Sequence, residues 1–270
     1  MKRIRNNLII VNLSLLILFS CSDNKNPLDS AGQSFKERDY AASVDILNKE
    51  ETKKRLNFDE AYLRGMSYYK LLQYNKALPD FKSCNSLKQG NKIILLKLGE
   101  CYLAMDMIDS AKGYFSYVVK LQPNDWQALN YRGLCYLRQK KTDSATNDLN
   151  KSIGIYPNYL AYNNLGQVNE FIKKFSAAIT YYNLSLRLNH SDDKVFFNKG
   201  VSLMYLDRPD SALFNYNKAI ALEGNNPVYY LNRGMASYLL KHRDSACKDW
   251  EKASNMGNGD ADSFLLKYCH

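Results

Sequence analysis

Apolar and polar residues alternate along most of this chain with the spacing of amphipathic helices. Apolar side chains return every three or four positions, as at Ala212, Leu213, Tyr216, Ala219 and Ile220. This period places them on one face of a helix. With 13 glycines and six prolines in 270 residues, the chain also has few of the turn formers that a turn-dense all-β protein needs. We therefore expect an all-α protein.

A second, longer period organises these helices. Glycine returns every 33 or 34 positions, at Gly65, Gly99, Gly133, Gly166, Gly200 and Gly234. Twelve positions after each glycine comes an alanine, at Ala77, Ala111, Ala145, Ala178, Ala212 and Ala246. Sixteen positions after each comes a large residue: Phe81, Phe115, Leu149, Tyr182, Tyr216 and Trp250. A fixed period of this length indicates one structural unit repeated along the chain.

The glycines need a physical reason to lie in the middle of a helix. Glycine costs about 1 kcal/mol relative to alanine there. We expect each glycine to let the two helices of its unit approach closely, with the alanine of the second helix facing it. The large residue then fills the gap to the next unit. Tyrosine, with 21 copies, suits such seams because its ring packs while its hydroxyl reaches water.

These units resemble the tetratricopeptide repeat, a helix-turn-helix unit of 34 residues. The blocks that carry the resemblance include Tyr131-Arg132-Gly133-Leu134-Cys135-Tyr136 and Asn164-Leu165-Gly166-Gln167. The resemblance covers residues 28–257 and implies an all-α, right-handed superhelical solenoid of about seven repeats. The first repeat is degraded, with Ala31 in place of the glycine and Ser43 in place of the alanine. The amphipathic residues 258–270 are expected to form a C-terminal capping helix.

The first twenty residues predict a secretory signal. Lys2, Arg3 and Arg5 precede a mostly apolar stretch over residues 8–19. Twelve helical residues rise about 18 Å, too little for a hydrocarbon core of roughly 30 Å. A positive segment before a short apolar stretch is typical of an export signal. A buried N-terminal helix is the alternative, but no charged face follows the apolar run.

The end of this stretch, Leu18-Phe19-Ser20-Cys21, resembles the lipobox of bacterial lipoproteins. The resemblance implies cleavage of residues 1–20, acylation of Cys21, and a polar tether over residues 21–27. Asp23 is loosely similar to the acidic export signals of Bacteroidota lipoproteins. We therefore expect a lipid-anchored protein of the cell envelope, most readily in the outer membrane, that faces the periplasm or the cell surface.

The formal net charge of +10 does not indicate nucleic-acid binding. Removing residues 1–20 removes three cations and leaves 34 Lys and Arg against 27 Asp and Glu, or +7, mostly as single side chains on helix surfaces. No metal-ligand spacing, phosphate-binding loop or Ser/His/Asp grouping is present. We expect no catalytic residues, no metal, no cofactor and no small-molecule substrate.

In the family that this chain resembles, the first helix of each repeat lines a concave groove that binds partners. Asparagine stands two positions before the glycine in three consecutive units. Its amide can pair with a peptide backbone because it is both donor and acceptor. The alternative is that these asparagines are only solvated. The partner-binding groove implied in this way consists of Asn163, Asn164, Gln167, Phe197, Asn198, Val201, Leu231, Asn232 and Met235.

Five cysteines remain besides Cys21. Cys247 lies in the second helix of the last repeat, and Cys269 lies at the end of the cap that should pack on it. The two either form a disulfide, which an extracytoplasmic location permits, or remain unpaired packing residues. Cys101 and Cys135 occupy the same place in adjacent repeats, which should put them beyond the roughly 7 Å Cα separation that a disulfide allows.

The triplet Asp-Ser-Ala recurs at the start of four second helices. An aspartate in the first turn suits the helix dipole and the free N–H groups there. The triplet also resembles the O-glycosylation acceptor of exported Bacteroidota proteins. That second interpretation makes candidate glycosylation sites of Ser110, Ser144, Ser211 and Ser245.

Together these features predict a non-enzymatic envelope lipoprotein that acts through protein–protein interaction. The expected activity is binding of a peptide segment or protein partner in the concave groove, as a scaffold or assembly factor. The alternative is a structural subunit of a secretion or outer-membrane assembly complex. Such a subunit would contact its partners through its convex surface or edges and have no peptide ligand.

Overall fold

A computed structural model describes residues 26–269 of the chain, and this part consists of fifteen α-helices without a strand. The predicted export signal, the predicted lipidation site Cys21 and most of the predicted tether lie outside the described residues. Those features therefore stay predictions.

Fourteen of the helices pair into seven consecutive hairpins. The first four hairpins are α1 (Pro27–Lys36) with α2 (Tyr40–Glu51), α3 (Phe58–Lys70) with α4 (Tyr74–Leu87), α5 (Lys92–Ala104) with α6 (Ile108–Leu121), and α7 (Trp126–Arg138) with α8 (Thr142–Ile155). The remaining three are α9 (Tyr159–Phe171) with α10 (Phe175–Leu188), α11 (Asp193–Tyr205) with α12 (Pro209–Leu222), and α13 (Pro227–Leu239) with α14 (Arg243–Asn255). A single helix, α15 (Gly259–Tyr268), follows the last hairpin.

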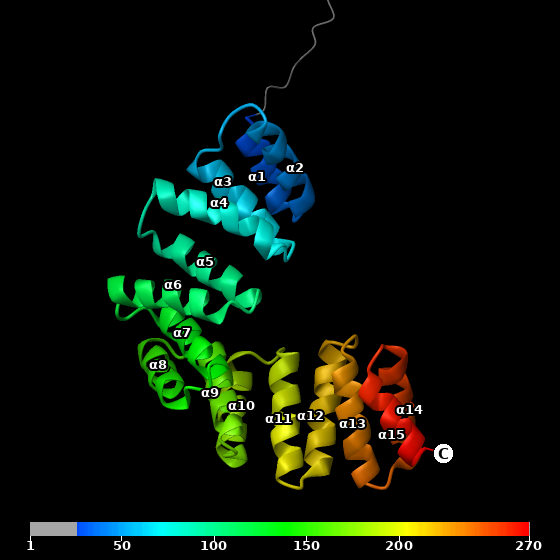
Figure 1. Cartoon of the computed structure of the whole chain (residues 1–270). Helices are drawn as coiled ribbons and strands as arrows, with labels where there is room; N and C mark the ends of the chain where they lie inside the picture. The colour runs from blue at the N-terminus through cyan, green and yellow to red at the C-terminus, as the bar shows by residue number, and fades with distance from the viewer. Residues whose placement is uncertain (1–25, 270) are drawn as a thin grey trace, which may run out of the picture.

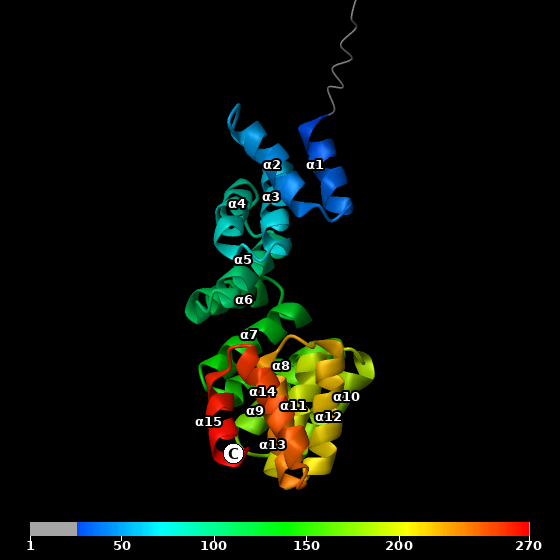
Figure 2. The ribbon, with the colours of Figure 1, turned by 90° about the vertical axis from the view of Figure 1, so that its right-hand side faces the viewer.

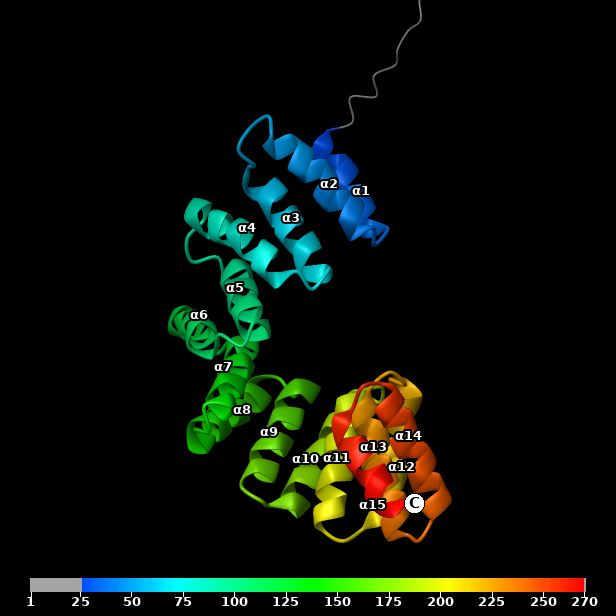
Figure 3. The same ribbon diagram turned by 45° about the vertical axis from the view of Figure 1, so that its right-hand side comes forward.

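The hairpins stack one after another along a curved path, from α1 at one end to α15 at the other (Figure 1). Turned by 90°, helices α1–α6 form a column that extends away from the C-terminal hairpins (Figure 2). The intermediate view shows the path turning at α7 and α8 (Figure 3). The architecture is thus the predicted all-α superhelical solenoid of seven hairpins with a C-terminal helix.

The two helices of six hairpins meet at the periodic glycine. In each of these hairpins, the large residue sixteen positions later is fully buried, as is the alanine twelve positions later. A Cβ atom added at Gly99 or Gly200 would lie 2.5 Å from a ring carbon of Phe115 or Tyr216. One added at Gly166 would overlap the ring of Tyr182. At these three glycines, and at Gly133 and Gly234, the large side chain occupies the space of a Cβ, whereas at Gly65 a Cβ would make a tight contact of 3.0 Å with Phe81.

Each first helix from α3 onward begins with a side-chain cap. The cap accepts a hydrogen bond from a backbone N–H of the first turn, which satisfies one of the donors that a helix start leaves free. The residues that do this are Asn57, Asn91, Asp125, Asn158, Asp192 and Asn226, and Asn258 does the same for α15. A capping Asn or Asp thus stands at the start of each of these first helices, about one period after the previous one.

The turns inside the hairpins also repeat. Each contains one non-glycine residue in the left-handed region, with φ between 55° and 65°. The seven are Arg38, Leu72, Asp106, Lys140, Lys173, Asp207 and Lys241. Because this conformation reverses the chain in the same way each time, the second helix of every hairpin returns along the first.

Three hairpins carry an additional internal ion pair. Arg132 donates through Nε and Nη2 to the two carboxylate oxygens of Asp148, at 2.6 and 2.9 Å. The pairs Arg64–Asp80 and Arg233–Asp249 have the same two-pronged geometry. In all three, the arginine precedes the periodic glycine and the aspartate precedes the large residue. Such bidentate pairs fix geometry as well as charge, so they align the two helices.

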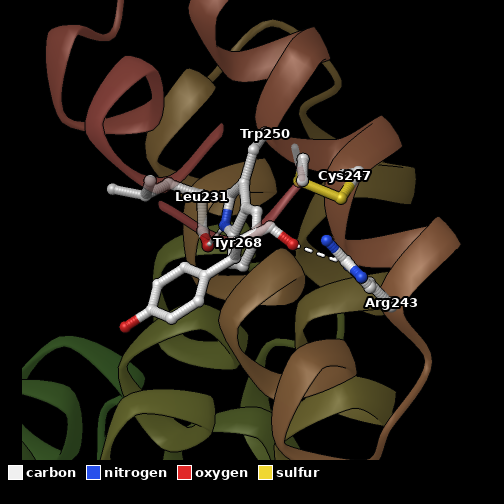
Figure 4. Close-up of a disulfide and its surroundings, with 6 residues drawn as sticks. Leu231, Arg243, Cys247, Trp250 and Tyr268 are labelled. Carbon is white, nitrogen blue, oxygen red and sulfur yellow. Dashed lines mark hydrogen bonds between the residues drawn. A yellow bond between two sulfur atoms is a disulfide. The ribbon is translucent and has the colours of Figure 1, made fainter. Parts of the chain in front are cut away.

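The C-terminal helix closes the end of the array. Trp250 of α14 stacks on Phe264 of α15 at a ring-centroid distance of 5.3 Å, and Cys247 and Cys269 form a disulfide with a Cα–Cα distance of 5.8 Å. Arg243 Nε donates to the carbonyl oxygen of Tyr268 at 2.7 Å (Figure 4). Of the two alternatives for Cys247 and Cys269, the structure contains the bond. It ties α15 covalently to the last hairpin.

The cysteines at positions 84, 101 and 135 are free and buried. Burial raises the pKa of each of these thiols to about 12, because the thiolate would lose its hydration. These cysteines therefore act as small packing residues, and a reactive thiolate is disfavoured at all three.

Candidate functional site

A cavity of about 1040 Å³, called the central cavity below, opens between the first helices of four consecutive hairpins. It extends from the C-terminal end of α7 across α9 and α11 to the start of α13. The turns after α7 and α9 and the first residue of α10 complete its wall. Its residues are Leu137, Arg138, Lys140, Asn163, Gln167, Glu170, Phe171, Lys173, Phe175, Lys194, Phe197, Asn198, Tyr205, Asn226, Val228 and Tyr229.

Four of the predicted groove residues line this cavity: Asn163, Gln167, Phe197 and Asn198. Asn163 and Gln167 lie one helical turn apart on α9, and Phe197 and Asn198 lie on α11. The ring of Phe197 is held between Tyr216, at a centroid distance of 5.7 Å, and Tyr229, at 4.9 Å. The amide oxygen of Asn163 is buried and has no hydrogen-bond partner among the described residues. This acceptor is therefore enclosed by the protein, although the residue itself lines the cavity.

The asparagine row does not act as one surface, which corrects the prediction for Asn164. That side chain is only 5% exposed, and its Nδ2 donates to Asn130 Oδ1 at 3.0 Å. It joins α9 to α7 inside the array. Asn232 donates to the carbonyl oxygen of Val228 in its own helix at 2.8 Å. Of the three asparagines in the row, only Asn198 lines the central cavity.

Three apolar residues of the predicted groove also lie outside the wall of the central cavity. Val201 packs against the core around Leu203 and Tyr216. Leu231 packs against the C-terminal core, and its carbonyl oxygen accepts a hydrogen bond from Trp250 Nε1 at 3.2 Å. Met235 is half-buried one turn further along α13. Val201 and Leu231 thus contribute to hairpin packing.

An aromatic shelf that the sequence analysis missed forms one end of the cavity. Phe175 and Tyr205 stack with centroids 4.4 Å apart and ring planes inclined by 6°. Tyr205 is 67% exposed, and Phe171 beside them is 49% exposed. Large rings left open to solvent on a cavity wall offer apolar contact area to a ligand. We call Phe171, Phe175 and Tyr205 the aromatic shelf.

Glu170 is the one acidic residue in the wall of the cavity. Its Oε2 accepts hydrogen bonds from the hydroxyl of Tyr182 at 2.8 Å and from that of Ser202 at 3.1 Å. Burial raises the pKa of Glu170, although the two hydroxyls favour the carboxylate and act in the opposite direction. The Glu170 carboxylate is therefore hydrogen-bonded to two core residues, and its burial makes the charged form less favourable.

Four basic side chains share the wall of the cavity with this single acid: Arg138, Lys140, Lys173 and Lys194. All four are exposed, and none forms an ion pair with a carboxylate of residues 26–269. The wall of the cavity consequently carries excess positive charge next to exposed aromatic rings.

The helical period of the sequence could have identified Glu170 and two residues of the aromatic shelf. Glu170 follows Asn163 by seven positions, and Phe171 follows Gln167 by four, so both continue the predicted face of α9 by one turn. Tyr205 stands five positions after its glycine, as Phe171 does. Following the face to the ends of the first helices would have reached Glu170 and the aromatic shelf.

The Asp-Ser-Ala triplets lie where the sequence places them, in the first turns of α6, α8, α12 and α14. None of these four helices has a side-chain cap at its start, so the aspartates act through the helix dipole rather than as caps. Ser144 and Ser245 are exposed, and Ser110 and Ser211 are half-buried. Glycosylation of these serines stays a prediction.

Residues 26–269 hold no cluster of three or more His, Cys, Asp or Glu side chains that could bind a metal ion. Across the same residues, none of the helices has both the length and the apolarity needed to span a membrane.

Two family models match the centre of the chain, and both describe the tetratricopeptide repeat (TPR). They cover residues 96–159 and residues 160–192. Residues 96–192 are tetratricopeptide repeats. Because the same hairpin geometry continues on both sides, the described chain has the fold of a TPR solenoid. Arrays of this fold are generally scaffolds for protein–protein interaction.

Solved structures with the same fold include a TPR protein from Parabacteroides merdae, with 17% identity, a TM-score of 0.70, and coverage of 90% of this chain and 96% of that one. PilF of Pseudomonas aeruginosa aligns with 19% identity and a TM-score of 0.67 over 78% of this chain and 97% of its own. YrrB, described as a TPR protein with an unusual peptide-binding site, aligns with 16% identity and a TM-score of 0.53 over 69% and 97%. No curated protein matches the chain.

We predict that Glu170→Gln raises stability at neutral pH. A carboxyl whose pKa is higher in the folded than in the unfolded state stabilises the fold below its unfolded pKa, and this contribution is lost as pH rises through the folded pKa. Glutamine keeps an oxygen for Tyr182 and Ser202 without the buried charge. In urea unfolding from pH 4 to pH 8, the free energy of unfolding of the variant should rise relative to that of the parent as the pH rises. The exposed Glu251→Gln is the control, and a Glu170→Gln variant less stable than the parent at pH 7 would refute the prediction.

Proposed function

We propose that this chain is a non-enzymatic scaffold that binds a segment of a partner protein in its central cavity. The observation that carries the proposal is the exposed aromatic shelf on a cavity wall that also contains the amide residues Asn163, Gln167 and Asn198. The shelf offers apolar contact, and amide side chains offer donors and acceptors that a peptide backbone can pair with. The peptide-binding site for which YrrB is described adds support from the same fold.

The mechanism of binding would be preorganisation. The wall of the cavity belongs to helices whose caps, turns and glycine contacts fix them in place. Phe197 is held between two tyrosine rings. A wall that is already ordered loses little conformational entropy when it binds, so more of the contact energy appears as affinity.

The proposal also places the scaffold in the cell envelope. The support is the export signal in residues 1–20 and the lipobox resemblance at Cys21. Acyl chains contribute about 0.8 kcal/mol per buried CH₂, so Cys21 would hold the array at a membrane surface. Fractionation tests this part: the parent should sediment with membranes, and Cys21→Ser should appear in the soluble fraction or remain unprocessed. A variant that is processed and stays with the membrane like the parent would contradict the anchor.

Site-specific cross-linking tests the binding surface. We expect the photoreactive analogue p-benzoylphenylalanine, placed at Phe171 on the shelf, to cross-link a partner in cells. Mass spectrometry should map the adduct to a short extended segment of that partner. Phe214 on α12 is a matched control, because it is a phenylalanine of at least equal exposure (60% against 49% for Phe171) on a second helix. Adducts formed only from position 214 would instead support a structural subunit that uses its convex surface.

A further inference from the structure

We propose that the central cavity selects acidic segments, and specifically segments in which Asp or Glu residues stand next to a large apolar side chain. This inference rests on the proposed function and specifies the chemistry of the ligand. It is carried by the charge of the cavity wall and by the position of the aromatic shelf beside that charge.

The charge of the wall is uncompensated. Arg138, Lys140, Lys173 and Lys194 line the cavity without a carboxylate partner in residues 26–269. The acid nearest to them in the wall, Glu170, is already bonded to Tyr182 and Ser202. An acidic ligand would supply the missing carboxylates, and its approach would be accelerated by the same field.

Several other cations of the first helices form ion pairs with carboxylates of the same chain. Arg132, six positions before Arg138 on the same helix, is paired with Asp148. Lys97 of α5 is paired with Glu100, and Arg233 of α13 with Asp249. Internal pairing is thus common along these helices, although Lys36, Lys70 and Lys199 also lack a carboxylate partner in residues 26–269. What distinguishes the central cavity is that four such cations line one wall.

Three of the four cations lie at the same end of the cavity as the aromatic shelf. Arg138 is the last residue of α7, and Lys140 and Lys173 occupy the left-handed positions of the turns after α7 and α9. Phe171 ends α9, Phe175 begins α10, and Tyr205 ends α11. The fold therefore gathers cations and rings at one end, where an acidic residue beside an apolar one would meet both.

The remaining wall favours a peptide over another polyanion. Stacked rings next to cations can also hold single-stranded nucleic acid. Here, however, the wall contains the carboxylate of Glu170. It would repel a nucleic acid, which carries a phosphate on every nucleotide, whereas a peptide carries charge only on some side chains and can direct them to the cations.

The test uses the purified full-length protein in detergent and an array of immobilised twelve-residue peptides. Every peptide holds a central phenylalanine, and its flanks are drawn from Asp and Glu, from Asn and Gln, or from Lys and Arg. The acidic class should bind about tenfold more tightly than the amide class, and this advantage should shrink as salt rises from about 50 to 500 mM. An unlabelled thymidine dodecamer serves as the nucleic-acid competitor.

Two sets of charge-neutralising variants locate the effect. Arg138→Gln, Lys140→Gln and Lys173→Gln together should remove the acidic preference, so that the acidic and amide classes bind this variant equally. The control set neutralises three exposed lysines outside the wall of the cavity, by Lys120→Gln, Lys151→Gln and Lys252→Gln, and should keep the preference. Loss of the preference in the control set would mean that net charge, not this cavity, selects the ligand.

The other outcomes separate this inference from the proposed function. If the amide or basic class binds best, and Phe171→Ala weakens that binding, the acidic preference is wrong while peptide binding stands. If the thymidine dodecamer displaces the acidic peptides and binds more tightly, the site is one for nucleic acid. If no class binds above the level of Phe171→Ala, peptide binding in this cavity is wrong as well.

Discussion

The contact between a glycine in the first helix and a large side chain in the second is the constraint on which the rest of this structure depends. Six hairpins contain it: a Cβ on the glycine would lie no more than 2.8 Å from the large residue in five of them, and 3.0 Å from Phe81 at Gly65. Close approach of the helices follows, and so does burial of the alanine four positions before the large residue. One face of each first helix therefore packs against its second helix. The opposite faces of successive first helices together line a common surface. The central cavity lies on that surface.

Tyr182 connects this constraint to the site. Its ring packs against Gly166, and its hydroxyl donates to Glu170 in the wall of the central cavity. Burial raises the pKa of both groups, which is the cost of placing a polar link inside the core. A side chain that holds the hairpin together therefore also sets the position of a carboxylate beside the ligand surface.

The fold could be predicted from the sequence because its contacts have fixed separations. Gly65 and Phe81 are sixteen residues apart, and the same separation returns with Gly234 and Trp250. The site could be predicted only in part, because a step of one residue rotates a side chain by about 100° around a helix. Asn163 therefore faces the cavity while its neighbour Asn164 bonds to Asn130 inside the array.

The unpredicted features depend on neighbours that one sequence does not specify. The aromatic shelf brings together the ends of α9 and α11 and the start of α10, and its cations come from two different turns. Arg138, Phe171 and Tyr205 share one place in the repeat, and Lys140 and Lys173 share another. Phe175 stands at a third place, so the period alone does not assemble the group. The disulfide was one of two alternatives for the same reason, since it required α15 to return onto α14.

A double-mutant cycle at Gly166 and Tyr182 tests the central claim most directly. The free energy of unfolding in urea would be measured for the parent, Gly166→Ala, Tyr182→Ala and the double variant. Because the added methyl group enters the space of the ring, the glycine substitution alone should cost about 1–3 kcal/mol. Gly113→Ala, at an exposed helical position with open space around it, should instead stabilise by up to about 1 kcal/mol. The account predicts that removing the ring relieves the clash, with a coupling above about 1 kcal/mol. Additive costs, within about 0.5 kcal/mol, would contradict it.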